Sequence, residues 1–460
     1  MKSKLFSVCF LLFSGFTFGQ STANFSRAEV LADFEYLYNA LEEAHYNLYA
    51  YTKKEEFARV YRELKASVTA DSLSLLETTS LFQRFVALAK NGHTNISFPV
   101  TAYVEYAYAG GKVFPLELAL EEGKALVRKN WSDTTGIEPG AELLSINDIP
   151  IADILSRIYP VISAERPYFQ RVKVEYWSFP RLYWQVFGAQ EAFTVTIRQG
   201  EFVTKLTLLA VDAIEGYEMK RTEVVNATMS YSFLPEGAYL NPGGFSGDEA
   251  AYRHFIDSAF TAINARGSER LIIDLRNNPG GEDAFSDYLV SYIADKPFTW
   301  NARFTLKTSA FLKEHVRAER DTTLPYWQAV LEHDDGEVYD YHFDPYQPQP
   351  AEQRFKGDVY VLVNRQSHSQ STVTAAQIQD YGFGTIVGEE TGDYPSLFAS
   401  VFQYSLPRTG ILVSVSKGYM VRVNGSTAPE GVIPDIQIKD HLLDEHDEIM
   451  QGLLQRLGRL

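Results

Sequence analysis

The chain has 460 residues, 45% apolar and 22% charged, a composition typical of folded globular proteins that excludes wholesale disorder and fibrous repeats. This length suggests about three domains. The 42 Lys and Arg against 59 Asp and Glu give a net charge of −17, which disfavours general binding to nucleic-acid phosphates. The single cysteine, Cys9, excludes a disulfide framework and a cysteine-rich metal site.

Residues 1–19 have the layout of a secretory signal peptide. Lys2 and Lys4 form a short basic start, an apolar run follows over 5–18, and Gly19 is a small residue suited to cleavage. The run is shorter than the ~20 apolar residues of a membrane span, and an uncleaved membrane anchor is the alternative. We therefore expect cleavage near Gly19/Gln20 and an exported protein, periplasmic or extracellular, without stable membrane insertion.

Residues 20–99 have the apolar spacing of helices, which predicts an N-terminal helical domain. Capping-box patterns at 26–29 and 52–55 mark two helix starts. A third apolar stripe is expected to end at 91–92, an Asn-Gly pair suited to a helix C-cap. His93 then lies just past a helix end, a rigid place from which to hold a side chain in a fixed direction.

Residues 100–213 are rich in strand-like runs. The segment 136–150 resembles the pattern G-x-x-x-G-D-x-I-L-x-I-N-G-x-P of PDZ domains, with Ala141 in place of Asp and Asp148 in place of Gly. The resemblance implies a PDZ-like domain, and such domains bind extended C-terminal peptides at a sheet edge. The stretch 155–190 is helical and long for a PDZ loop. A plain β-rich spacer is the alternative.

Residues 214–460 read as an α/β domain. Short apolar strands at 271–275 and 359–363 alternate with helical stretches at 252–265 and 372–381. Apolar strands without alternation, separated by helices, indicate a sheet covered on both faces. The segment 305–356 is expected to be a surface insertion.

Two segments of this domain carry possible chemistry. In 274–281, DLRNNPGG, a strand runs into a sharp turn whose paired glycines allow close backbone approach, and free N–H groups on such a turn can stabilise an oxyanion. In 363–372, VNRQSHSQST, serines lie between a strand and a helix N-terminus, which favours negative charge. Taken singly, the first is more often an ordinary turn and the second a helix cap.

Three further motifs follow in the same order as in one known family: QDYG at 379–382, VGEET at 387–391 and PEGVIPD at 429–435. With them the chain resembles the C-terminal processing (tail-specific) serine peptidase family, including its tricorn-core-like branch. The resemblance implies an α/β catalytic core with a ClpP/crotonase-like sheet and helices, preceded by an N-terminal helical bundle and a PDZ-like β-rich domain.

Carried onto this sequence, the resemblance makes Ser369 the nucleophile. One branch of the family uses a lysine base, but its position holds Tyr394, and Thr372 stands where many members have Glu. The tricorn-like branch uses a histidine from a Gly-His-Thr segment, which His93 matches, oriented by a late glutamate, which Glu430 matches. The resemblance thus implies a Ser–His–Glu triad. For Glu430, an exposed turn carboxylate is the alternative reading.

The resemblance also implies supporting residues. The oxyanion would be held by backbone N–H groups of Gly280 or Gly281 and of Gln370. Side chains expected to support the site or fix its turns are Asp274, Arg276 and Asp380.

The sequence therefore predicts an exported serine peptidase that hydrolyses peptides or protein C-terminal tails through an acyl-enzyme. No cofactor or metal is expected, because no H-E-x-x-H motif occurs and the nine histidines are scattered. The missing lysine motivates the alternative of a catalytically inactive peptide-binding protein on the same scaffold. Hydrolysis of a non-peptide ester or amide is a third reading, since the same triad serves any acyl transfer.

Overall fold

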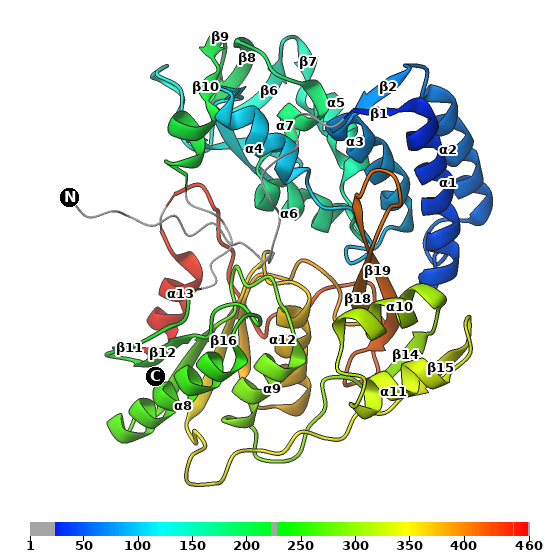
Figure 1. The fold of residues 1–460 in the computed structure, drawn as a ribbon. Helices are drawn as coiled ribbons and strands as arrows, with labels where there is room; N and C mark the ends of the chain where they lie inside the picture. The colour runs from blue at the N-terminus through cyan, green and yellow to red at the C-terminus, as the bar shows by residue number, and fades with distance from the viewer. Residues whose placement is uncertain (1–23, 222–227, 445, 459–460) are drawn as a thin grey trace.

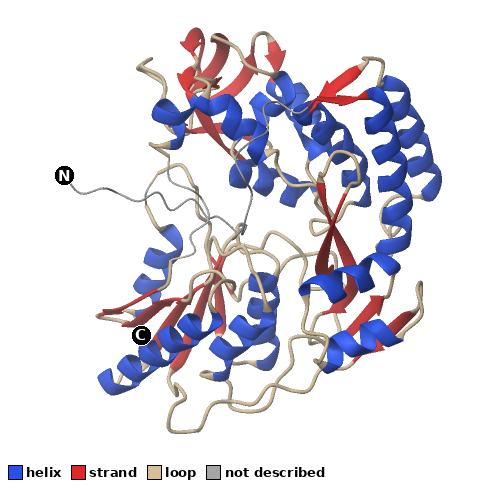
Figure 2. Ribbon diagram, in the orientation of Figure 1, coloured by secondary structure: helices blue, strands red, loops and turns tan. Residues whose placement is uncertain are grey.

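The structure is a computed structural model that describes residues 24–221, 228–444 and 446–458. The expected signal peptide, 1–19, lies outside the described residues. In chain order the elements form an N-terminal group of helices, a middle segment, taken here as residues 100–213, and a C-terminal α/β part (Figure 1). Figure 2 shows strands packed with helices in the middle and C-terminal parts.

The N-terminal part consists of three helices and a short antiparallel strand pair: β1 Asn24–Ser26, α1 Arg27–Ala44, α2 Lys54–Ser67, β2 Ser72–Ser74, α3 Leu75–Val86 and the 3₁₀ turn η1 Ala87–Ala89. The capping box at Ser26 and Glu29 is confirmed. The one at 52–55 is wrong: Lys53 is the N-cap of α2 and caps it with no side-chain bond, because Thr52 is buried instead.

The end of the third helix differs from the sequence prediction. α3 ends at Val86, and the 3₁₀ turn η1 that follows ends before 91–92, at its cap Lys90, which adopts a left-handed φ of 46°. Asn91 is buried, and its side-chain oxygen accepts hydrogen bonds from the N–H groups of His93 (2.7 Å) and Thr94 (2.9 Å). This side-chain turn therefore fixes the backbone at His93.

The middle segment is built around an antiparallel sheet with strand order β4-β5-β6-β8-β9, and β7 pairs with β6. Its elements are α4 Val100–Tyr108, β3 Lys112–Val113, β4 Leu116–Glu121, β5 Lys124–Asn130, β6 Glu142–Ile146, β7 Ile149–Pro150, α5 Ile151–Ile158, η2 Tyr159–Val161, α6 Pro167–Trp177, α7 Phe179–Phe187, β8 Ala192–Gln199, β9 Phe202–Leu209 and β10 Val211–Asp212, followed by the π-helical turn η3 Ala213–Glu218. The predicted helical stretch 155–190 corresponds to α5, α6 and α7.

The C-terminal part has a six-stranded sheet in the order β11-β12-β13-β16-β17-β20, parallel from β12 onward. Helices α8, α9 and α12 cover one face and α13 covers the other. The prediction of a sheet covered on both faces is confirmed. The elements are β11 Ser230–Leu234, β12 Gly237–Asn241, α8 Glu249–Arg266, β13 Arg270–Asp274, α9 Asp283–Ser291, β16 Asp358–Val363, α12 Gln370–Tyr381, β17 Thr385–Gly388, β20 Ile436–Gln437 and α13 Glu448–Leu457.

A second, antiparallel sheet, in the order β15-β14-β19-β18, joins this part to the N-terminal helices (Figure 1). It consists of β14 Arg303–Lys307, β15 Val338–Tyr341, β18 Leu397–Ser405 and β19 Leu412–Val421, and it packs with α10 Ala310–Glu319 and α11 Pro325–Glu332. The segment 305–356 is therefore less superficial than expected, because β14 pairs with strands on both sides. After His93 the chain forms one isolated β-bridge, between Asn95 and Ser414 of β19.

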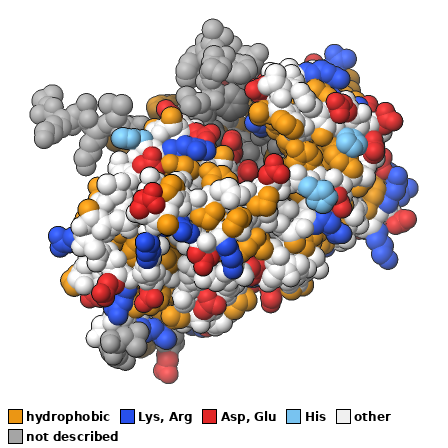
Figure 3. Space-filling view, turned by 90° about the horizontal axis from the view of Figure 1, so that it is seen from below, with side chains coloured by type: hydrophobic (Ala, Val, Ile, Leu, Met, Phe, Trp, Pro, Cys, Tyr) orange, Lys and Arg blue, Asp and Glu red, His pale blue; other side chains and the backbone are white. Residues whose placement is uncertain are grey.

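The surface shows no simple charge division on the face drawn in Figure 3, where acidic and basic side chains are interspersed with apolar ones. Within the described ranges, none of the helices has the length and apolar character that a membrane span requires.

Candidate active site

Ser369 and His93 meet although they lie 276 positions apart in the chain. The Oγ atom of Ser369 is 2.9 Å from Nε2 of His93. Both residues line a cavity of about 300 Å³. The structure thus brings together the hydroxyl and the imidazole that the sequence selects.

Parallel pairing of β13 and β16 explains where Ser369 lies. The two strands are in register up to Asp274 and Leu362, so the loops that follow them emerge side by side. Ser367 ties these loops together by donating to the carbonyl of Leu275 (2.7 Å), and the N–H of His368 donates to the carbonyl of Asn278 (3.2 Å).

The backbone of Ser369 is strained. As N-cap of α12 it has φ 55° and ψ −129°, which non-glycine residues rarely adopt. The buried carboxylate of Asp393 holds this conformation, because its Oδ2 accepts from the N–H of Ser369 (2.7 Å) and its Oδ1 from the Thr372 hydroxyl (2.6 Å). Burial, aided by Glu165, raises the pKa of Asp393 to about 7.

Asp393 is a residue that the sequence reasoning missed. It lies next to Tyr394, at the point where the lysine of the other family branch was sought, but no motif of this chain marks a carboxylate there. Thr372, noted only as a departure from Glu, is its hydrogen-bond partner.

His93 is held in its neutral form. Burial, with Lys173 and His368 nearby, lowers its pKa to about 3, so at neutral pH the imidazole can accept the serine proton. Its second ring nitrogen, Nδ1, is buried and has no hydrogen-bond partner in the described part of the chain.

Glu430 does not occupy the place next to that nitrogen. It is exposed on a turn, where its N–H donates to the carbonyl of Ala428 (2.9 Å). The following residue, Gly431, donates its N–H to Glu390 (2.8 Å). Between the described residues there is no hydrogen bond from Glu430 to His93, so its exposed-turn reading is the one that the geometry favours.

The glycine turn lies against Ser369. A Cβ atom on Gly280 would stand 2.5 Å from the backbone N of Gln370 and 2.8 Å from Cβ of Ser369, at a φ of +88°. The N–H of Gly280 already donates to the side chain of Asn278 (2.8 Å). The N–H groups of Gly281 and Gln370 have no acceptor among the described residues, which leaves these two as the donors free for an oxyanion.

The three supporting side chains divide into two places. Asp274 and Arg276 form an ion pair of 2.7 Å beside the turn, and Arg276 also pairs with Asp447. Asp380 lies at the far end of α12 and pairs with Arg422 (2.8 Å). Asp380 therefore braces a distant turn and does not contact Ser369 or His93.

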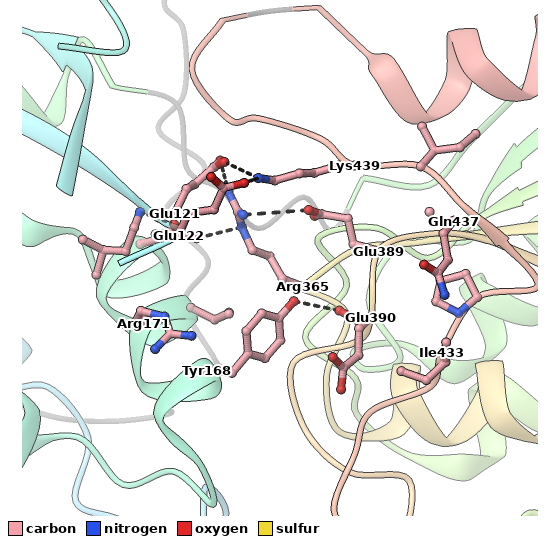
Figure 4. Close-up of a pocket in the computed structure, with 16 residues that line it drawn as sticks. Glu121, Glu122, Tyr168, Arg171, Arg365, Glu389, Glu390, Ile433, Gln437 and Lys439 are labelled. Carbon is pink, nitrogen blue, oxygen red and sulfur yellow. Dashed lines mark hydrogen bonds and ion pairs between the residues drawn. The ribbon is translucent and has the colours of Figure 1, made fainter. Parts of the chain in front are cut away.

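A second cavity, of about 540 Å³, lies between the middle segment and the C-terminal part (Figure 4). Arg365, four residues before Ser369, points into it and is buried among the carboxylates of Glu121, Glu175 and Glu389. In the portion of the chain that is described, no group of three or more His, Cys, Asp or Glu side chains is arranged to hold a metal ion.

Comparisons with known proteins agree with this architecture. The model of peptidase family S41 matches residues 238–438. The tail-specific protease of Haemophilus influenzae is 30% identical over 180 residues, which are 38% of this chain and 21% of that protein, so the chain spans about a fifth of the length of this curated relative.

The crystal structure of mature CPAF has a TM-score of 0.62 at 16% identity and covers 94% of this chain and 96% of its own. The structure of mature CPAF complexed with lactacystin has a TM-score of 0.63 at 16% identity, with 94% and 97% covered. At this identity the likeness shows the fold alone, and the family resemblance rests on the sequence matches. The chain contains a domain of peptidase family S41.

Proposed function

We propose that the protein is an exported serine peptidase that hydrolyses peptides or protein C-terminal tails through an acyl-enzyme. The observation that carries the proposal is the 2.9 Å contact between Ser369 Oγ and His93 Nε2 on an S41 domain. Export rests on the signal-peptide layout of residues 1–19.

In the proposed reaction, Ser369 attacks the scissile carbonyl carbon while its proton passes to Nε2 of His93. The carbonyl oxygen becomes an oxyanion, which accepts hydrogen bonds from the N–H groups of Gly281 and Gln370. The imidazolium then donates the proton to the leaving amine, and the acyl-enzyme forms. Water, deprotonated by the same imidazole, hydrolyses the ester and restores the serine.

The cavity suggests the kind of residue that is accepted. Its lining combines polar side chains with an apolar and aromatic part that includes Phe98, Val161, Trp177, Leu182 and Val401. This apolar part favours an apolar substrate side chain next to the scissile bond. The PDZ-like pattern in 136–150 supports recognition of a C-terminal tail by the middle segment.

The domain division that fits this function has a signal peptide at 1–19, helices over 20–99, a PDZ-like domain over 100–213 and a catalytic domain over 214–460. The catalytic pair comes from the second and fourth of these, because His93 precedes the middle segment and Ser369 follows it.

Ser369→Ala is expected to abolish both covalent labelling by a fluorophosphonate probe and hydrolysis of a fluorogenic apolar peptide, because the acyl acceptor is lost. Ser371→Ala is the matched control: this buried serine opens the same helix and makes only a 3.3 Å bond to the carbonyl of Leu275. Mass spectrometry should place the label on the peptide containing Ser369. Undiminished hydrolysis by the Ser369→Ala protein would refute the proposal.

Gly280→Ala is expected to lower kcat/KM by about 100-fold or more, since displacements of about 1 Å at reacting groups have effects of this size. Its Cβ atom would force Gln370 and Ser369 away from the turn. The control is Gly247→Ala, also at positive φ but with nothing within 4 Å of its Cβ. Steady-state kinetics on correctly folded protein, judged by circular dichroism, measures the effect; equal losses in both variants would contradict the argument.

A catalytically inactive peptide-binding protein is the second candidate. The unpartnered Nδ1 of His93 and the exposed position of Glu430 favour it. It predicts that C-terminal peptides bind without turnover and that His93→Ala leaves their affinity unchanged, which calorimetry with the matching amidated peptide can decide.

A further inference from the structure

Among the buried polar atoms near the catalytic pair that lack hydrogen-bond partners within the described residues are Nδ1 of His93 and Oε2 of Glu165. The two residues are tied together through the chain, because Oε1 of Glu165 accepts the N–H of Gly92, the residue before His93, at 2.7 Å. A Cβ atom on Gly92 would stand 3.2 Å from Oε2 of Glu165. An unsatisfied carboxylate oxygen thus lies beside the backbone of Gly92, the residue before His93.

We propose that Glu165, from the middle segment, is the carboxylate that positions His93 and stabilises its imidazolium. The inference rests on the proposed function and assigns to Glu165 the part that the family resemblance gave to Glu430.

The other acidic side chains of the site are less suited to this part. Asp393 has both carboxylate oxygens engaged, one by the N–H of Ser369 and one by Thr372. Glu430 is exposed on its turn. Glu165 alone of these three is both buried and left with a free oxygen.

Helix α6 holds Glu165 in place. Glu165 lies two residues before this helix, and the ring of Phe169, on its first turn, packs between two glycines. The ring is 3.0 Å from the Cβ position of Gly92 and 3.0 Å from that of Gly392, which precedes Asp393. It also lies 5.7 Å, centroid to centroid, from the ring of His368, which precedes Ser369.

Phe169 therefore packs against the residues that precede His93, Ser369 and Asp393. A larger side chain at Gly92 or Gly392 would displace its ring. Through this contact the middle segment takes part in building the catalytic site.

Lys173, one turn further along α6, is the cation that opposes the rise in the pKa of Glu165 caused by burial. Its Nζ donates to the carbonyls of Ser163 (2.7 Å) and Gly92 (3.3 Å). Burial raises the pKa of Glu165, and Lys173, the Gly92 N–H and Arg166 oppose that rise. The pKa of His93 is lowered by burial, Lys173 and His368, so a carboxylate is needed to offset them when the imidazole takes a proton.

Other ionisable groups face this cluster. Glu165 raises and Lys173 lowers the pKa of Asp393. Burial, with a smaller contribution from Glu165, raises the pKa of Tyr51 and of Tyr394. In the reaction Glu165 forms and breaks no covalent bond: the proton moves from Ser369 Oγ to Nε2 of His93, and the carboxylate stabilises the resulting positive charge.

Glu165→Gln tests the inference, because Gln keeps an acceptor for the Gly92 N–H and removes only the charge. We expect kcat to fall roughly 10- to 100-fold with KM little changed, as for loss of an interaction made in the transition state. The acid limb of the kcat/KM profile should move to lower pH, since a carboxylate raises the pKa of a neighbouring imidazole. Glu430→Gln is the matched control and should leave both unchanged.

A second measurement does not depend on peptidase activity. The pKa of His93, followed by NMR of ¹⁵N-histidine protein in the Ser369→Ala background, should fall by about one unit in Glu165→Gln and rise in Lys173→Met. If the protein shows no hydrolysis and the two pKa shifts of His93 are still observed, the proposed function fails and the Glu165–His93 coupling stands. If wild type is active and Glu165→Gln changes neither kcat nor the pKa of His93, the inference is overturned. If Glu430→Gln instead lowers kcat and the pKa of His93, Glu430 is the carboxylate that positions His93.

Discussion

His93→Ala should lower kcat/KM for an apolar peptide by about 10⁴- to 10⁶-fold, the range seen when a serine hydrolase loses its base. The Oγ of Ser369 lies 2.9 Å from Nε2 of His93, whereas His368, the residue before Ser369, is engaged through Nδ1 with the carbonyl of Gln366 (2.9 Å). Without His93 the hydroxyl would have to lose its proton to water.

The measurement is steady-state hydrolysis together with the rate of labelling by the fluorophosphonate probe. Both should collapse, while the melting temperature changes little, because Nδ1 of His93 makes no hydrogen bond to any described residue. His254→Ala, an exposed histidine on α8, is the control and should behave as wild type. A His93→Ala protein that keeps a tenth of the wild-type rate would rule out His93 as the base.

Arg365→Met should destabilise the protein by about 3–5 kcal/mol, the usual result of removing one partner of a buried ion pair. The Arg365 side chain is 7% exposed and lies 3.0 Å from Glu121 and 3.1 Å from Glu175, whose side chains are 4% and 2% exposed. Burial opposes the charge on Arg365, but the carboxylates of Glu175, Glu389 and Glu121 outweigh it and keep its pKa above the usual range. Met would leave these carboxylates buried beside an apolar side chain.

Chemical denaturation monitored by tryptophan fluorescence measures this effect. Arg171→Met, which changes the same residue type in the same cavity, should alter stability by less than about 0.5 kcal/mol. Adding Glu175→Gln to Arg365→Met should recover part of the loss, because one uncompensated charge is removed. Equal stabilities of the Arg365→Met and Arg171→Met proteins would show that the cluster in Figure 4 does not hold the two parts together.

Much of the fold could be predicted from local patterns. The buried strands β13 and β16, the helices α8 and α12 and the capping box at Ser26 follow from hydrophobic periodicity and from short-range hydrogen bonds, which act within a few residues. Local errors arose where tertiary burial outweighed the local preference. Thr52 is buried and so does not cap α2, and β14 joins a sheet whose other strands come from distant segments.

The candidate site divides in the same way. Ser369, His93 and the glycine turn stand in short motifs, so the order of these motifs along the chain was enough to select them. The roles of Asp393 and Glu165 have no such signature. A carboxylate becomes important through desolvation and through what it faces, and both depend on how separate segments pack.

The sequence determined the strands and helices of the α/β part, and its resemblance to a peptidase family selected the pair of residues proposed to perform acyl transfer. Only the tertiary structure decided which carboxylates are buried beside that pair. The ring of Phe169 contacts Gly92, His368 and Gly392, which precede the three site residues, and it comes from a segment in which no catalytic motif occurs. Periodicity reports how a segment packs along its own axis, whereas contacts between segments far apart in the chain are set by the shapes of the folded parts.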